Sequence, residues 1–191
     1  MRCAGCGAEV DGAAGLQFTC PRAEAGDDVD HLLTPLATMP AVWPDTDERN
    51  PFIRYRDLMY PARLAGSLGM SDDAYCEVVR SLDEAVARVD GRGFGETPLV
   101  LAEGLGSHVW VKNETEHVGG SHKARHLMGV MLALKVRELA GDSQGAQSRL
   151  AIASCGNAAL AAGVIARAAD RPIDVFIPED ARASVVERLK D

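Results

Sequence analysis

Residues 111–125 read VKNETEHVGGSHKAR, and the rest of the chain can be organised around them. A strand-like apolar run leads into two adjacent glycines, and a Ser-His-Lys sequence then opens a long segment with apolar residues at helical spacing. Glycine pairs mark tight turns, and serine is a common helix cap. We therefore expect a helix over residues 122–140, capped by Ser121 and stopped by Gly141, with Lys123 at its start.

A second turn of this kind follows at residues 154–157, which read Ser-Cys-Gly-Asn. It separates an apolar run at 149–154 from an alanine-rich run at 157–169, and these predict a buried strand and a helix. A further strand at 173–177 and a helix starting at 183–190 continue the pattern. The alternation indicates right-handed βαβ units, so we expect an α/β fold with a partial open parallel sheet and flanking helices.

Three further elements are expected ahead of the lysine turn. Apolar spacing predicts a helix over 71–89, which Ser71 or Asp72 can cap and a glycine-rich stretch ends. Two short strands are expected at 99–102 and 108–112, joined by a glycine-containing turn.

The chain divides into three expected parts. Residues 1–35 form an irregular segment with three of the five cysteines, residues 36–95 form an irregular and helical lead-in, and residues 96–191 form the α/β region. Within the lead-in, prolines and aromatic rings at 35–61 predict an irregular segment laid over a surface.

Composition excludes some classes of protein. The chain is 47% hydrophobic and 5% aromatic, which favours helix-on-sheet packing. Its formal net charge of -8 disfavours a nucleic-acid binder, because such proteins carry a basic face. No apolar run approaches the length of a membrane span, and the first residues lack the apolar core of a signal peptide, so we expect a cytoplasmic location. An odd number of unevenly spread cysteines does not indicate a disulfide framework.

The lysine turn allows nucleophilic chemistry. Desolvation would lower the pKa of the Lys123 amine, and the positive end of the helix dipole acts in the same direction, which leaves more of the amine neutral. The alternative is a solvated first-turn lysine, since most lysines are surface residues. A nucleotide P-loop fits poorly, because it needs Ser or Thr after the lysine, and here Ala124 follows and His122 precedes.

The turn at 154–157 offers complementary chemistry. Its backbone N–H groups open a helix and can bind a carboxylate, and the Asn157 amide can donate to a phenolate oxygen. Taken alone, an ordinary strand-to-helix turn explains it better. Together with Lys123, it suits an enzyme in which the lysine holds a carbonyl cofactor as a Schiff base, with both turns facing one crevice of the parallel sheet.

Five stretches carry a resemblance to a known family: residues 96–99, 111–114, 119–125, 153–159 and 176–178. Together they resemble the tryptophan-synthase-β superfamily of pyridoxal-phosphate enzymes, called fold type II. Its members include threonine synthase, threonine dehydratase and cysteine synthase. The similarity covers about residues 96–191, and the cysteine-rich start is similar to that of threonine-synthase-like proteins.

The resemblance implies a pyridoxal 5'-phosphate cofactor and a role for each turn. Lys123 would form the internal aldimine and later remove the substrate's α-proton, and Asn157 would hydrogen-bond the cofactor's 3-oxygen. Ser154, Cys155 and Gly156 would hold the substrate's α-carboxylate. A β- or γ-substituent of an amino acid would then be eliminated or replaced, in a lyase or synthase reaction. Family precedent also implies a homodimer.

Two departures leave the reaction open. Relatives of threonine synthase commonly have Phe before the lysine and Asp after it, where this chain has His122 and Ala124; His in the first place resembles tryptophan synthase β. In the family, a glycine-rich phosphate cradle normally lies downstream of the lysine, and no such stretch is found before Asp191. We therefore expect a fragment of a longer enzyme or half of a two-chain assembly. A serine/threonine ammonia-lyase (dehydratase) and a non-catalytic truncated homologue stay open as alternatives.

The cysteine-rich start resembles part of a zinc site. Cys3 and Cys6 have the spacing of one half of a zinc ribbon, and Cys20 could begin the second half. Ala23 stands where a further cysteine is wanted, and His31 is a replacement ligand at irregular spacing. The alternative is a degenerate remnant that packs without metal.

Overall fold

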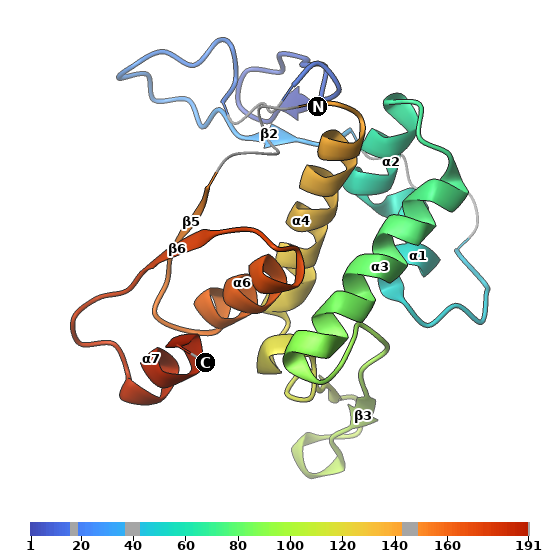
Figure 1. Cartoon of the computed structure of the whole chain (residues 1–191), viewed down its shortest axis with the longest axis vertical. Helices are drawn as coiled ribbons and strands as arrows, with labels where there is room; N and C mark the ends of the chain where they lie inside the picture. The colour runs from blue at the N-terminus through green and yellow to red at the C-terminus, as the bar shows by residue number, and fades with distance from the viewer. Residues whose placement is uncertain (16–18, 37–42, 143–148, 191) are drawn as a thin grey trace.

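The computed structural model describes residues 1–15, 19–36, 43–142 and 149–190. In chain order its elements are β1 (Arg2–Cys3), β2 (Leu33–Thr34), α1 (Pro51–Arg54), η1 (Arg56–Leu58), α2 (Tyr60–Ser67), α3 (Asp72–Asp90), β3 (Leu99–Leu101), η2 (Glu103–Leu105), β4 (Trp110–Lys112), η3 (Val118–Gly120), α4 (Lys123–Leu139), β5 (Leu150–Ala153), α6 (Asn157–Ala168), β6 (Ile173–Phe176) and α7 (Ala183–Lys190). The predicted fold class is confirmed: helices accompany a small parallel strand pair, after an irregular cysteine-rich start (Figure 1).

Four helices, α2, α3, α4 and α6, build the main apolar core. α3 begins as predicted, because the Ser71 hydroxyl accepts a hydrogen bond from the Ala74 N–H at 3.2 Å, and it ends at Gly91 with a φ of 79°. The core residues with no exposed surface are Val79, Val86, Val118, Ala124, Met128, Leu132, Val136 and Ala161. Burial of one such valine or leucine side chain stabilises the fold by about 1.5–3 kcal/mol. Because Val118 and Ala124 flank the lysine turn, that turn is fixed to the core.

The strands form separate two-stranded sheets among the described residues. β3 and β4 pair antiparallel. β5 and β6 pair parallel and are connected through α6, as in a βαβ unit. The predicted burial of residues 149–154 is wrong: Ala151 and Ala153 are exposed, and Leu150 and Ile152 are only half-buried. The physical reason is that α4 and α6 cover one face of this pair, so every second side chain faces away from the helices.

The lead-in is more regular than predicted. Residues 51–67 contain α1, η1 and α2, and Phe52 and Leu64 from them are buried in the core. Asn50 caps α1 by accepting from the Phe52 N–H at 2.9 Å, with Pro51 at the first helical position, and both features start helices. Part of the predicted irregular segment, residues 37–42, lies outside the described residues.

The N-terminal segment lies over the C-terminal end of α4, whereas the β3–β4 hairpin lies at the opposite end of the molecule (Figure 1). The contact runs through Arg137, which is 2% exposed. Its guanidinium donates to the carbonyl oxygens of Gly12 and Gly15, the latter at 2.7 Å. It also pairs with Asp142 at 3.2 Å. α4 therefore connects the cysteine-rich segment at one end to Lys123 at the other.

Candidate active site

The loop before Lys123 depends on two glycines. Gly119 and Gly120 have φ values of 66° and 72°, which side-chain-bearing residues rarely adopt. A Cβ atom on Gly119 would lie 3.4 Å from the Cα of Ala161 in α6. Glycine therefore lets this loop, η3, rest directly on α6.

Three hydrogen bonds hold the same loop from other sides. The Gly119 N–H donates to the Asp90 carboxylate at the end of α3, at 3.2 Å. Arg92 donates to the Glu116 carbonyl oxygen at 2.7 Å. The buried Ser121 hydroxyl accepts from the Lys123 N–H at 3.3 Å, so the serine contacts the helix start. The cap residue, however, is His122 and not Ser121 as predicted, because the helix begins only at Lys123.

Lys123 itself is exposed in this structure, which agrees with the alternative of a solvated first-turn lysine. The reason is its place on α4: Ala124 and Met128 take the buried face and have no exposed surface, which turns the neighbouring lysine away from the core. Within the described residues, the Lys123 amine makes no hydrogen bond or ion pair. It is accessible to a small carbonyl compound.

The turn at 154–157 is anchored by its first residue. The Ser154 N–H donates to the Phe176 carbonyl oxygen at 3.0 Å, which extends the β5–β6 ladder, and its hydroxyl accepts from the Gly156 N–H at 3.4 Å. Gly156 precedes α6, and no side chain caps this helix start. Cys155 and Asn157 are exposed, and Ser154 and Gly156 are half-buried. The turn therefore offers an amide, a hydroxyl and helix-start N–H groups to a ligand.

The structure connects the two turns differently from the prediction. β4, which leads to Lys123, pairs with β3 and not with the β5–β6 pair, so among the described residues the turns do not share one sheet edge. They are connected instead through α6. Asn157 and Ala161 are one helical turn apart on one face, and Gly119 of the lysine loop packs against Ala161.

An ion pair beside the lysine was not predicted from the sequence. The Arg125 Nε donates to the Glu114 carboxylate at 3.0 Å, and the Thr97 hydroxyl donates to the same carboxylate at 2.5 Å. Burial raises the pKa of Glu114, but the bonds from Arg125 and Thr97 outweigh it, and the pKa lies below its usual value. All three residues lie in the stretches that carry the family resemblance. Their place in these stretches is the sequence signal that could have identified the network. The network fixes the first turn of α4 to the loops before it.

The histidines near Lys123 fall into two environments. His117 is 3% exposed and its ring packs edge-on against Phe94 with centroids 5.1 Å apart. Burial holds the pKa of His117 below its ordinary value. His122 and His126 are exposed on α4.

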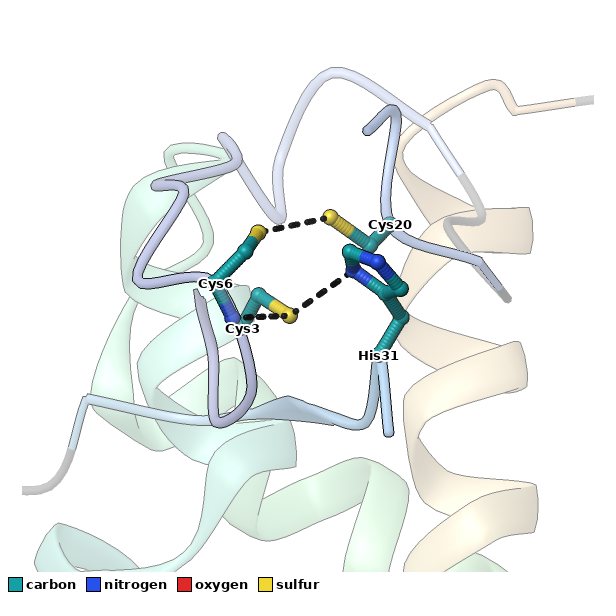
Figure 2. Close-up of side chains that lie close together, drawn as sticks. All are labelled: Cys3, Cys6, Cys20 and His31. Atoms are coloured by element: carbon teal, nitrogen blue, oxygen red, sulfur yellow. Dashed lines mark hydrogen bonds between the residues drawn. The ribbon is translucent and has the colours of Figure 1, made fainter. Parts of the chain in front are cut away.

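The N-terminal cysteines come together with a histidine (Figure 2). Cys3 Sγ lies 3.5 Å from His31 Nδ1, and Cys6 Sγ lies 3.6 Å from Cys20 Sγ. The four ligand atoms all lie within 4.8 Å of one another. The Cys6 N–H, which points at the Cys3 sulfur, is the main reason that the pKa of Cys3 falls to about 6. The predicted ligand residues and the proposed replacement therefore form one cluster.

The chain resembles a known family of proteins over its C-terminal half. A family model described as "Pyridoxal-phosphate dependent enzyme" matches residues 91–191. No curated protein matches the chain. In the part of the chain that the structure describes, no helix is both long and apolar enough to cross a membrane.

Proposed function

Because the chain belongs to the family of pyridoxal-phosphate dependent enzymes, we propose that it is a lyase or synthase that acts on an amino acid. The reaction proposed is elimination or replacement of a β- or γ-substituent, as in the threonine-synthase-like branch. The observation that carries this proposal is the packing of the lysine loop on α6 through Gly119 and Ala161. It puts an accessible amine and the start of a helix on one small framework.

The residues of the two turns fit the cofactor. Lys123 is an exposed amine without a partner among the described residues, so it can hold the cofactor's aldehyde carbon. Asn157 is exposed at the start of α6 and can donate its amide hydrogen to the ring's 3-oxygen. When bound, pyridoxal phosphate supplies an electron sink for negative charge at the amino acid's α-carbon.

The remaining steps are those of the chain's own groups. The N–H groups at the start of α6, with the Ser154 hydroxyl and the backbone of Cys155 and Gly156, would bind the substrate's α-carboxylate, because a helix N-terminus favours an anion. The Lys123 amine would accept the proton from the α-carbon and return it later in the cycle. Arg125 and Glu114 would keep the first turn of α4, and with it Lys123, in a fixed direction.

Covalent trapping tests the cofactor assignment. The chain has only four lysines, Lys112, Lys123, Lys135 and Lys190, which makes the attachment site easy to locate. After addition of pyridoxal phosphate and reduction with borohydride, peptide mass spectrometry should find the pyridoxyl group on Lys123. Lys135→Arg is the matched control, because this lysine lies on the same helix and pairs with Glu138 at 3.2 Å. A label spread evenly over the four lysines would contradict the assignment.

Product analysis separates the alternatives. Ammonia and a 2-oxo acid formed from L-serine or L-threonine would favour the ammonia-lyase. A new amino acid formed by replacement would favour the synthase. A chain that takes no specific label at Lys123 would be the non-catalytic homologue.

The location and assembly belong to the same proposal. We propose that the enzyme is cytoplasmic, as expected from its sequence, and that it is a homodimer, as the resemblance implies. Fractionation of cells and light scattering of the purified chain test these two points.

A further inference from the structure

We propose that Cys3, Cys6, Cys20 and His31 bind one zinc ion, and that this ion fixes the N-terminal segment to α4. The proposal concerns a site at the far end of α4 from Lys123 and does not depend on the pyridoxal-phosphate assignment (Figures 1 and 2).

The spacing of the ligand atoms fits tetrahedral coordination. Zinc–sulfur bonds of about 2.3 Å and zinc–nitrogen bonds of about 2.0 Å place neighbouring ligands roughly 3.5–3.8 Å apart in a tetrahedron. The distances of 3.5 Å between Cys3 and His31 and 3.6 Å between Cys6 and Cys20 match this value. The side chains converge from three separate stretches of chain toward one point (Figure 2).

The histidine is oriented for binding through Nδ1. Its Nε2 lies 3.0 Å from the Asp27 carboxylate, which accepts the Nε2 hydrogen and leaves the Nδ1 lone pair facing the sulfurs. Asp27 is itself held by the N–H groups of Val29 at 2.9 Å and Glu24 at 3.2 Å. A carboxylate behind a ligating histidine is the usual outer partner in zinc sites, since it fixes both ring and tautomer.

The sulfurs receive similar support from the backbone. The Cys6 N–H points at the Cys3 sulfur at 3.5 Å, and the Arg22 N–H points at the Cys20 sulfur at 3.4 Å. These donors stabilise thiolates, the form that binds metal. Gly5 lies within the first turn, and a Cβ there would come within 2.4 Å of the Asp30 carbonyl oxygen. Only glycine lets the stretch before His31 approach this closely.

The ligand set selects zinc and a structural role. Three thiolates with one imidazole in a tetrahedron are typical of zinc, and four protein ligands leave no position for a substrate. Cys3 and Cys20 are 1% and 3% exposed, so the centre is closed from that side. The site therefore holds chain segments together and does not take part in the chemistry at Lys123.

Such a centre would stabilise the segment, because the apolar core among its described residues, 1–15 and 19–36, is small. The buried members there are Cys3, Ala8 and Cys20, with Cys6 and Leu33 packed against them, and proposed ligands make up most of that set. A core of this size does not fold by hydrophobic burial alone. Ordering the segment also holds the Gly12 and Gly15 carbonyl oxygens in position to accept hydrogen bonds from Arg137 of α4.

Metal analysis of the purified chain is the first test. We expect one zinc per chain, and replacement by cobalt(II) should give the intense visible absorption of a tetrahedral thiolate site. Cys6→Ser should lose the zinc, whereas Cys155→Ser, which changes an exposed cysteine outside the cluster, should keep it. Zinc well below one per chain in protein purified with a reductant, or a Cys6–Cys20 disulfide in that protein, would overturn the proposal.

Two milder variants keep the test valid if a ligand variant fails to fold. Asp27→Asn should bind zinc roughly 10–100-fold more weakly, because it loses the carboxylate behind His31. His31→Cys should retain one zinc and shift the cobalt spectrum toward that of four sulfur ligands. Unchanged affinity in the first variant together with an unchanged cobalt spectrum in the second would show that His31 is not a ligand.

Discussion

The direction of one side chain separates the observed site from the expected one. The sequence correctly marks Lys123 as the start of a helix, but it does not show which face of that helix is buried at this position. Ala124 and Met128 occupy the buried face, so the lysine is exposed. An exposed lysine is not activated by burial.

Substitution of the lysine is the most direct test of the proposed reaction. Lys123→Ala should lower kcat by at least about 10²-fold, because it removes the group that moves the α-proton. The fold should survive, since the side chain is exposed. Steady-state assays, with far-UV circular dichroism as the control for folding, measure this. Turnover and cofactor binding equal to those of the unchanged chain would refute the role.

The buried histidine predicts a dependence of stability on pH. Burial lowers the pKa of His117 from an ordinary value of 6.5, so between the two values the unfolded state binds more protons. The contribution of neutral His117 to the free energy of unfolding should therefore be fully present above pH 6.5. It should decrease as the pH falls from 6.5 toward the folded-state pKa. Urea unfolding of His117→Phe should show a weaker fall over the same window, because the new ring keeps the packing against Phe94 without a proton to bind. An equal fall in both proteins would contradict this.

The elements themselves were largely predictable, and their pairing was not. Apolar spacing and cap residues identify α3, α4 and α6 within a few residues, because these signals are local. Pairing of strands depends on contacts between distant segments, so the separation of β3–β4 from β5–β6 could not be read from the pattern. The short helices α1, η1 and α2 were missed, because the start signals of α1, Asn50 and Pro51, lie among other prolines that suggested irregular chain.

The ion pair at the start of α4 should matter more than one on the surface. Arg125→Ala should lower the free energy of unfolding by roughly 1–3 kcal/mol, because it breaks hydrogen bonds to a partly buried carboxylate. Arg149→Ala is the matched control: its pair with Asp174 lies on exposed side chains, and its loss should cost less than about 1 kcal/mol. Chemical unfolding of the two variants measures both. Equal losses would mean that Glu114 and Arg125 do not anchor the helix.

Across the whole chain, the sequence predicts the class of protein better than the reaction. The family is shown by its match to residues 91–191, in agreement with the resemblance carried by a few short stretches. Which amino acid is used depends on side chains that contact its substituent, and no motif here identifies them. The division at residues 35 and 95 stays a prediction. His31 could be suggested only as a replacement ligand at irregular spacing, because the loop that carries it back to Cys3 is not periodic.

Removal of metal should affect the two ends of the molecule unequally. A strong chelator should lower the thermal unfolding midpoint and expose amide hydrogens in residues 1–35 first, since the proposed zinc orders that segment. Trapping of the cofactor at Lys123 should persist at temperatures where α4 remains folded. Hydrogen exchange read by mass spectrometry can follow both regions in one experiment. Uniform loss of protection along the chain would contradict a locally acting centre.

The contact of Gly119 with Ala161 has a consequence for how this catalyst can vary. Because the loop before Lys123 rests directly on that alanine, the size of the side chain at position 161 sets how closely this loop approaches α6. A larger residue there would push η3 away from α6 without altering any group in the proposed chemistry. Ala161→Val should thus weaken cofactor binding while leaving Lys123 unchanged. The size of this effect would measure how much the proposed site depends on the spacing between the two turns.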